Sequence, residues 1–466
     1  MKIGLIWLRR SLRLEDNYVI MKALKNCNKV IFAFVFDINI LKNFPNREDR
    51  RLSFIVNALE IIDSSLKEHG SRLVILFGDP ATEIIETAKK FKADYVFADE
   101  DFEPLSIERD RLVKEGLKYN KIEFIPVLDH LLFPHNKILN SNGLPYRVYT
   151  PYMKAFSSKI LQQDYKAHDY NLNNKLVDYK TIDFCKEEIL KKAGYEYKDD
   201  KIWRPEKAKE ILSEFAKNKL QEYEGSRNNL YQNGTSAISP YLRFGIISIR
   251  QCFKLALKLE NSPAWCNELI WREFYSYILF HFPETAKEEF QRKYRNKIKW
   301  SDNKENFEAF INARTGFPLI DAAVSELLLT GWMHNRARMV VASFFTKNLF
   351  LDWRLGEKFF SQYLMDYDLA SNVGGWQWAA SVGTDAQPYF RIFNPISQGV
   401  KFDPDGMYVK NYLPILRGVY IKHIFDGDSI AKNYKIGYPK PIVDYQTTRK
   451  KAISYFSSIN DQNNFR

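Results

Sequence analysis

The stretch KIGLIWL at residues 2–8 is a nearly unbroken apolar run, and similar runs recur along the first part of the chain. Such runs are typical of strands buried on both faces of a parallel sheet. Helix-length segments separate them, so this part of the chain predicts a βαβ series. The predicted strands are residues 2–8, 30–37, 73–79, 94–100 and 122–128.

The series predicts an α/β domain at residues 1–130, built on a parallel, doubly wound, five-stranded sheet. No GxGxxG motif follows the first strand, which argues against a dinucleotide fingerprint there. A ligand could still bind at the carboxyl ends of the strands, near Asp37 and residues 99–103.

Residues 131–202 are rich in Lys, Asn and Tyr and carry turn signals, which is typical of a long connector between domains. From residue 203 the hydrophobic period becomes helical, so residues 203–466 predict a larger, all-α domain. The chain has 466 residues, too many for one ordinary core, and this agrees with two or more domains.

The formal net charge of +12 suits a polyanionic partner such as nucleic acid, or an anionic membrane surface. A lysine-rich composition without any such partner is the alternative. Four cysteines without CxxC spacing argue against a disulfide framework and a zinc site, so we expect no metal. The chain has no signal-peptide pattern and no membrane-spanning apolar run, so we expect a cytoplasmic protein that does not span a membrane.

The stretch DYDLASNVGGWQWAASVGTDAQPYFRIFNP at residues 366–395 combines acids, an amide, a Gly-Gly pair and two tryptophans. On an extended or turning backbone, Trp376 and Trp378 would point the same way. Gly374 and Gly375 would allow positive φ and a close backbone approach. These features indicate a site for a flat, hydrogen-bonding ligand, and an irregular core loop with solvated acids is the alternative.

Three further stretches add polar groups to the helical part. In WCNELIWREFY at residues 265–275, Glu268 and Arg272 share one helix face with tryptophan, so they are either partly buried or a simple surface pair. The stretch NGTSAISPYLRFG at residues 233–245 could donate N–H and O–H groups to phosphate, or serve as a plain helix cap. In GWMHNRARM at residues 331–339, Met339 is either core filler or part of a site.

In order along the chain, these and related motifs resemble the DNA photolyase/cryptochrome family. The matching motifs, from residue 1 to about residue 413, are IWLRRSLRLEDN, NGTSAISPYLRFG, ELIWREFY, TGFPLIDAA, GWMHNRARM, DWRLGEKFF and NVGGWQWAASVGTDAQPYFRIFNP. Within the family the chain is most similar to class I cyclobutane pyrimidine dimer photolyases. The resemblance implies an antenna-binding α/β domain and a helical, catalytic FAD-binding domain.

The resemblance also implies an activity, that of a deoxyribodipyrimidine photo-lyase, which is a carbon–carbon lyase. Excited FADH⁻ would give an electron to a pyrimidine dimer flipped out of double- or single-stranded UV-damaged DNA. The enzyme would act as a monomer. A cryptochrome-like blue-light sensor, with the same flavin and tryptophans but without repair, is the alternative.

The resemblance assigns roles to individual residues. FAD would be held by Tyr223, Thr235, Ser236, Ala237, Ile238, Ser239, Trp265, Glu268, Arg272, Arg338, Asp366, Tyr367, Asp368 and Asn372. Catalysis would depend on Glu268 and Asn335 at the base edges, on Asn372 at flavin N5, and on an electron path through Trp376, Trp353 and Trp300. The lesion and the DNA backbone would contact Arg227, Trp271, Asn335, Arg336, Met339, Trp378 and Arg391. We also expect Asp366 to pair with Arg338.

Two departures refine these expectations. Related (6-4) photolyases carry histidines around residues 334–339, whereas Asn335 and Met339 here favour cyclobutane dimers. Leu105 and Ser106 replace the Asn-Glu pair of the best-known folate-binding members, and DEDFEPLSIERD is closer to the deazaflavin type. A second, antenna chromophore is expected, either methenyltetrahydrofolate or 8-hydroxy-deazaflavin, with an empty pocket as the remaining alternative.

Overall fold

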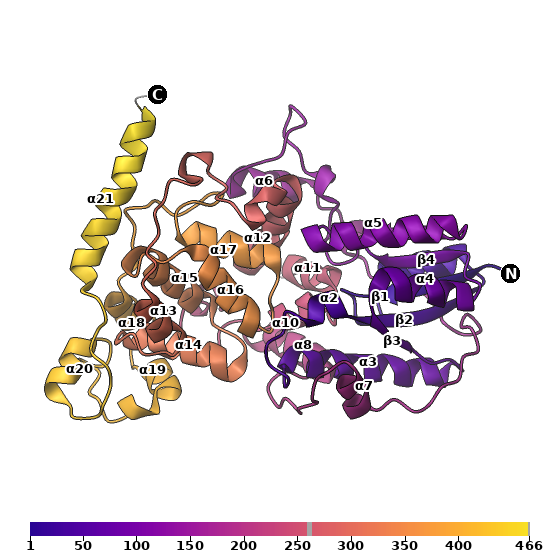
Figure 1. Cartoon of the computed structure of the whole chain (residues 1–466), viewed down its shortest axis with the longest axis horizontal. Coiled ribbons are helices and arrows are strands. Elements are labelled where there is room, and N and C mark those ends of the chain that lie inside the picture. Colours follow the sequence, from indigo (N-terminus) through magenta and orange to yellow (C-terminus); the bar gives the residue numbers. More distant parts are fainter. Residues whose placement is uncertain (259–262, 465–466) are drawn as a thin grey trace. The chain divides into compact units, whose positions relative to one another are not determined.

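The computed structural model describes residues 1–258 and 263–464 (Figure 1). The chain forms two compact units. The first unit is made of Met1–Pro145, Met153–Gln221 and Ser236–Glu273, and the second of Tyr146–Tyr152, Glu222–Thr235 and Phe274–Arg466. Parts of the predicted helical domain therefore group with the sheet, and the domain boundaries at residues 130 and 202 stay a prediction.

The first unit contains one five-stranded sheet in the order β3-β2-β1-β4-β5, with every neighbouring pair parallel. This confirms the predicted sheet. The strands are β1 (Ile3–Leu8), β2 (Lys29–Asp37), β3 (Val74–Gly78), β4 (Tyr95–Asp99) and β5 (Glu123–Val127). The chain reverses its direction of travel across the sheet between β1 and β4, which makes their carboxyl ends a topological switch point.

Helices cover both faces of this sheet, so it is doubly wound (Figure 1). Successive side chains of a strand point to opposite faces. Ile6 and Phe32 belong to the core on the side of α1 (Tyr18–Asn26) and α3 (Arg50–Glu68). Their neighbours in the strands belong to the core on the side of α4 (Pro80–Lys90) and α5 (Pro104–Tyr119).

Part of the predicted connector packs onto the sheet. Val30 at the start of β2 donates its N–H to Lys175 O at 2.8 Å and accepts from Val177 N at 3.0 Å. The remaining helices that lie wholly or mainly in the first unit are α2 (Ile38–Leu41), α6 (Tyr149–Lys159), α7 (Lys186–Lys192), α8 (Ala208–Asn218), α10 (Ser239–Arg243) and α11 (Ile249–Lys258).

The second unit is helical, as predicted. Among its described residues there is no strand, only an isolated bridge between Ser301 and Leu351. The helix α12 (Pro263–His281) begins in the first unit and ends in the second. The other helices of this unit are α9 (Tyr223–Ser226), α13 (Lys304–Ile311), α14 (Pro318–Thr330), α15 (Asn335–Ser343), α16 (Trp353–Tyr363), α17 (Leu369–Ala379), α18 (Pro395–Phe402), α19 (Met407–Tyr412), α20 (Gly427–Asn433) and α21 (Tyr445–Asn464). None of the helices that the structure describes is both long and apolar enough to cross a membrane.

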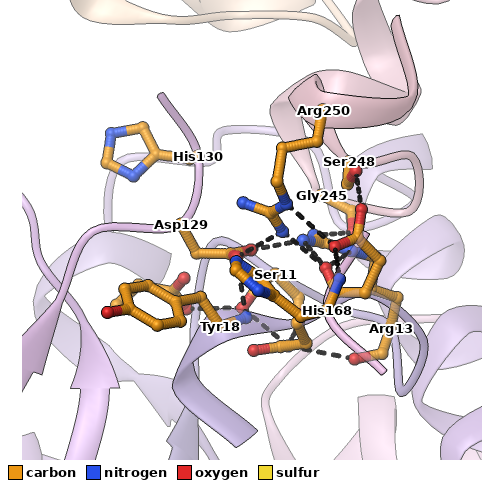
Figure 2. A network of polar contacts seen from close by, with 12 residues as sticks. Ser11, Arg13, Tyr18, Asp129, His130, His168, Gly245, Ser248 and Arg250 are labelled. Atoms are coloured by element: carbon orange, nitrogen blue, oxygen red, sulfur yellow. Dashed lines mark hydrogen bonds and ion pairs between the residues drawn. The ribbon is translucent and has the colours of Figure 1, made fainter. Parts of the chain in front are cut away.

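A buried ion network joins distant segments of the first unit (Figure 2). Arg250, at the start of α11, donates to Asp16 Oδ1 at 2.8 Å and to Asp129 Oδ1 at 2.7 Å. Arg13 also pairs with Asp129, and Ser248 donates its hydroxyl to Asp16. The loop after β1, the loop after β5 and the start of α11 thus share one set of charges.

Asp129 lies at the centre of this network and is completely buried. Burial by itself would raise the pKa of Asp129, but the guanidinium groups of Arg13 and Arg250 outweigh it and lower the pKa to about 2. The pairing therefore stabilises the fold fully above pH 3.8, the ordinary value, and this contribution is lost as pH falls toward 2.

Replacing Asp129 by asparagine should destabilise the first unit by about 3 kcal/mol or more, because two buried guanidinium groups lose their counter-charge. The measurement is the urea midpoint of unfolding at pH 7, followed by far-UV circular dichroism. Glu108→Gln is the matched control, since it breaks an exposed pair with Arg111 that water screens. Equal midpoints for the two variants would contradict the central role of Asp129.

Candidate functional site

The residues predicted to hold a cofactor are divided between the two units. The first unit contains Ser236, Ala237, Ile238, Ser239, Trp265, Glu268 and Arg272. The second contains Tyr223, Thr235, Arg338, Asp366, Tyr367, Asp368 and Asn372. Each set of side chains therefore belongs to the packing of its own unit.

In the first unit, the turn before α10 has an unusual backbone. Ala237 has φ of 50°, a left-handed conformation that residues other than glycine seldom adopt. Local strain of this kind is concentrated at ligand sites and switch regions. The hydroxyls of Ser236 and Ser239 flank the strained residue, which is a donor set suited to phosphate oxygens.

Helix α12 carries the next predicted side chains. Trp265 is buried, and its ring lies 5.1 Å from that of Phe215, centroid to centroid. Glu268 and Arg272 are half-buried, and Arg272 donates to His130 O at 2.8 Å. The tryptophan-bearing helix is therefore a buried element, and its charged side chains do not form a simple surface pair.

The sequence analysis overlooked Glu273, the residue that follows Arg272. It is buried, accepts from Leu132 N at 3.0 Å, and burial raises its pKa to about 7. Arg272 and Glu273 thus attach α12 to the segment just after β5 from two adjacent positions. Its place beside Arg272 in a helix of mainly apolar and aromatic residues is the sequence signal that could have suggested this role.

Polar side chains gather at the carboxyl ends of β1 and β4, where a ligand was expected. The guanidinium of Arg9 lies 4.4 Å from the ring centroid of Trp7 and donates to Asp110 at 2.5 Å. Arg109 lies 5.1 Å from the same ring. Burial, together with the nearby carboxylate of Asp129, raises the pKa of Asp99 to about 6. Both arginines are therefore held around one indole at the switch point.

His130 follows Asp129 in the chain and lies beside the buried ion network (Figure 2). It is buried, and within the part of the chain that the structure describes neither ring nitrogen has a hydrogen-bond partner. Burial and the neighbouring Arg10 lower its pKa well below 6.5, which favours the neutral ring. Burying imidazole nitrogens without hydrogen-bond partners costs free energy. Such a ring therefore fits a site that receives a polar ligand.

In the second unit, the expected pair of Arg338 and Asp366 is present. Arg338 Nη2 lies 2.8 Å from Asp366 Oδ2, and its Nε donates to Met333 O at 2.8 Å. The Asp366 side chain is buried, whereas the guanidinium keeps partial exposure. The second contact fixes the plane of the guanidinium, so that the pair is held in one orientation.

Asn372 is oriented by an acid that the sequence analysis did not identify. Its Nδ2 donates to Glu357 Oε1 at 3.0 Å and to Glu357 O at 3.1 Å. Tyr367 donates its hydroxyl to the same carboxylate at 3.2 Å, and burial raises the pKa of Glu357. Asp368 caps α17 by accepting from Ser371 N at 3.1 Å. Asn372 is therefore held by its amide nitrogen, with its oxygen available for a different contact.

The predicted backbone of the Gly-Gly-Trp segment was wrong. Gly374, Gly375, Trp376 and Trp378 all lie inside α17, and neither glycine has positive φ. Two residues correspond to about 200° around a helix, so the two indoles point to different sides. The expected close approach is present, however, because a Cβ at Gly374 would lie 2.1 Å from the ring of Tyr275.

The three tryptophans of the expected electron path lie in the second unit, Trp353 and Trp376 within its core and Trp300 packed against that core. A Cβ at Gly356 would lie 2.2 Å from Trp376 Cη2, so only glycine lets α16 approach this indole so closely. Trp353 lies three residues earlier on the same face of α16, and both indoles are buried. Trp300 adjoins Ser301, whose N–H donates to Phe350 O at 2.8 Å, close to the start of α16. Trp300 is half-buried, and its ring lies 5.3 Å from that of Phe350, centroid to centroid.

Helix α15 presents the residues expected to face a substrate. Asn335 is exposed, whereas Met339 is half-buried. Arg336 donates to Asn228 Oδ1 at 2.6 Å, and its guanidinium lies 4.5 Å from the ring centroid of Phe402. The same unit contains the exposed Arg391 and the half-buried Trp378 and Arg227, whereas Glu268 and Trp271 belong to the first unit.

The start of α15 is supported by a buried acid, Glu326, which the sequence analysis did not single out. It accepts from His334 N at 3.1 Å and from the Tyr408 hydroxyl at 2.7 Å. Burial raises the pKa of Glu326 to about 7 and lowers the pKa of His334 to about 4. His334 accepts from Arg336 N through Nδ1 and so caps the helix as a neutral ring. It is therefore a helix-capping histidine.

Two family models match the chain. Residues 4–169 match a model described as DNA photolyase, and residues 265–458 match one described as the FAD binding domain of DNA photolyase. The deoxyribodipyrimidine photo-lyase of Synechococcus sp. is 36% identical, covering 98% of this chain and 96% of the relative. That of Alkalihalophilus pseudofirmus is 32% identical and covers 98% of both chains.

Solved structures give the same result. A bacterial class III photolyase from Agrobacterium tumefaciens is 31% identical with a TM-score of 0.88, covering 99% of this chain and 98% of that one. An archaeal photolyase from Sulfolobus tokodaii with two FAD molecules is 30% identical with a TM-score of 0.83, covering 98% of this chain and 100% of that one. A Synechocystis cryptochrome is 23% identical with a TM-score of 0.85 over 98% of this chain and 99% of that one, and so shares the fold.

Glu326→Gln should remove a pH-dependent loss of stability from the second unit. Because the pKa of Glu326 is about 7 in the fold and 4.5 ordinarily, its protonated form stabilises the fold at low pH, and this contribution is lost as pH rises toward 7. Between pH 5 and 8 the variant should gain about 3 kcal/mol relative to the wild type. Urea unfolding at both pH values is the measurement, with the exposed Glu305→Gln as control. Identical pH dependence in wild type and Glu326→Gln would contradict the prediction.

Proposed function

Because the chain belongs to the DNA photolyase family, we propose that it repairs cyclobutane pyrimidine dimers in DNA with the energy of blue light. The observation that carries the proposal is its full-length similarity to relatives named deoxyribodipyrimidine photo-lyase. The enzyme would be a carbon–carbon lyase acting on UV-damaged DNA. The arrangement of its side chains supports this activity in several ways.

The donor set of the chain fits FAD. Hydroxyls around the strained Ala237 suit phosphate oxygens, while the Arg338–Asp366 pair and the Asn372 amide suit a flat ring with donors and acceptors. When bound and reduced, FAD supplies the electron that light drives into the dimer. We assign the binding of this group to the fourteen residues named from the resemblance, and none of them has to act as a general base.

Asn372 would present its amide oxygen to the ring nitrogen of the cofactor. Its Nδ2 already donates to Glu357. The amide oxygen is therefore the atom that would accept a hydrogen bond from the cofactor. Burial raises the pKa of Glu357 and so disfavours a full negative charge beside the ring. The protein would thus control the hydrogen bonding of the ring. Among the described residues, no three His, Cys, Asp or Glu side chains are grouped to bind a metal.

A flipped-out dimer would be held between apolar walls and polar groups. Trp271 and Trp378 would contact the bases, Met339 would adapt to their shape, and Glu268 and Asn335 would bond the base edges. Each stacked base contributes about 1–3 kcal/mol. A dimer is poorly stacked in the duplex, so flipping it costs less than flipping normal bases.

Three arginines would contact the DNA backbone. Arg227, Arg336 and Arg391 are cationic and at least partly exposed in the second unit. Contacts with phosphates position the DNA and make affinity fall as salt is added. The net charge of +12 agrees with this polyanionic partner.

A second chromophore would bind at the switch point of the sheet, near Arg9, Arg109 and His130. Parallel sheets bind ligands outside the carboxyl ends of their strands at such a point. The ring nitrogens of His130, which have no hydrogen-bond partner among the described residues, and the two arginines could hydrogen-bond a polar ring system there. Methenyltetrahydrofolate and 8-hydroxy-deazaflavin both have this chemistry. We further propose a monomeric, cytoplasmic enzyme of class I.

The direct test is repair of a dimer-containing oligonucleotide by purified protein with reduced FAD under blue light. Native thymines should reappear under illumination and not in the dark, as measured by chromatography of the digested oligonucleotide. Absence of repair, together with light-dependent binding of another protein, would favour the sensor instead.

Trp378→Ala should weaken binding of damaged DNA by about 1–3 kcal/mol, because stacking on one base is lost.

Trp376→Phe should remove most of the light-driven reduction of bound, oxidised FAD. Phenylalanine keeps the apolar volume in contact with Gly356 but is much harder to oxidise than indole. The measurement is the decay of flavin absorbance under blue light with a thiol present. Trp332→Phe is the matched control, because Trp332 lies outside the series of three tryptophans. Unchanged photoreduction in Trp376→Phe would contradict the proposed electron path.

A further inference from the structure

The two buried tryptophans of the proposed path differ in what their indole N–H groups meet. Trp353 Nε1 donates to Glu289 Oε1 at 3.3 Å. Trp376 Nε1 is buried and has no hydrogen-bond partner among the residues that the structure describes. One indole is therefore bonded to a carboxylate, while the other lies in an apolar setting between the rings of Phe345 and Phe360.

We propose that Glu289 is a positioning residue that makes Trp353 easier to oxidise than Trp376. An electron vacancy created at Trp376 would then move outward to Trp353 and would be slow to return. The inference rests on the proposed function, because it assumes that these tryptophans conduct electrons to a bound flavin. It adds to that function a residue which sets the direction of transfer.

The electrostatic argument depends on how the charges around Trp353 are exposed. Glu289 is 4% exposed and its carboxylate accepts from the indole N–H, so little water screens it from positive charge on the oxidised ring. The guanidinium of Arg354 lies 4.6 Å from the ring centroid and opposes this effect. Arg354 is 35% exposed and is shared with Asp352 at 3.1 Å, so water and a second carboxylate weaken its influence.

Glu289 is held in place by contacts that do not involve the indole. Arg354 Nη2 lies 3.0 Å from Glu289 Oε1, and Arg354 Nε donates to Lys287 O at 2.7 Å. Arg295 donates to the backbone carbonyl of Glu289 at 2.7 Å. The carboxylate is thus preorganised, and little reorganisation is needed when charge develops on Trp353.

The transfer itself is a one-electron step. Trp353 gives one electron to the electron-deficient Trp376, which returns to its neutral form, and Trp353 becomes a cation radical. No covalent bond breaks, and the indole proton stays on Nε1, where it is shared with Glu289. Trp300 can then supply an electron to Trp353, and a soluble thiol then reduces the oxidised Trp300.

The test compares light-driven reduction of bound, oxidised FAD in Glu289→Gln, Glu289→Asp and the wild type. Glu289→Gln keeps a carbonyl acceptor but loses the charge, and its initial rate should fall about tenfold or more, because a buried unit charge is weakly screened. Glu288→Gln is the matched control, since Glu288 is a more exposed neighbour paired with Arg295. A Glu289→Gln rate within twofold of the wild type would overturn the proposal.

The conservative variant separates charge from shape. Glu289→Asp keeps the negative charge near the indole and should retain more of the rate than Glu289→Gln. An equal loss in both variants would show that only the shape of the side chain matters, and it would overturn the electrostatic role.

A second readout does not depend on the flavin. In protein labelled with indole-¹⁵N tryptophan, Trp353→Phe assigns the indole N–H resonance of Trp353. This resonance should lie downfield of that of an indole N–H without a hydrogen bond, and it should move upfield in Glu289→Leu. A resonance that does not move would overturn the hydrogen bond.

Wild-type protein whose flavin is reduced chemically before illumination measures repair separately. Failure of repair in that sample would overturn the proposed function, whereas normal photoreduction in Glu289→Gln overturns only the role of Glu289.

Discussion

The first unit depends on one buried carboxylate, Asp129, whose charge is tolerated only because two guanidinium groups share it (Figure 2). Removing such a charge from water is costly unless pairing and hydrogen bonding offset it. Arg13 comes from the loop after β1 and Arg250 from α11, so the requirement for pairing fixes two remote segments against the end of β5. The same loops lead to Arg9 and His130 at the switch point. The proposed site for a second chromophore would therefore be shaped by an ion pair that lies outside it.

The second unit applies the same physical rule to different groups. Glu326 and Glu289 are buried acids and Glu357 is half-buried. Each accepts a hydrogen bond from a group that the proposed function uses: the N–H that begins α15, the amide of Asn372 and the indole of Trp353. A buried acid must find donors, and the donors are fixed in return. The acids need hydrogen-bond donors, and the donors are oriented by the acids. This explains why the proposed FAD site contains several carboxylates although the proposed reaction needs no general base.

The sheet could be predicted from the sequence because its strands are apolar on both faces, and runs such as residues 2–8 carry that signal locally. The Arg338–Asp366 pair could be expected from the resemblance. The conformation of Trp376 and Trp378 could not, because Gly-Gly before them favours a turn on local grounds, while packing of Tyr275 on Gly374 favours a helix. The buried acids were missed for a similar reason. Glu289 and Glu357 look like surface residues in charged segments, and only tertiary packing removes them from water.

Charge counted from composition also misrepresents the interior of the second unit. Lys347 adds one positive charge to the formal total, yet it is buried, and burial lowers its pKa well below 10.5. It donates to Ala380 O at 3.0 Å and to Ser381 Oγ at 2.9 Å, so it closes the end of α17 as a hydrogen-bond donor, and burial favours the uncharged amine. A cation there would lie one helical turn beyond Trp376 and would oppose an electron vacancy on that indole. Burial disfavours that cation, which is the same direction in which the carboxylate at Trp353 would act on the proposed path.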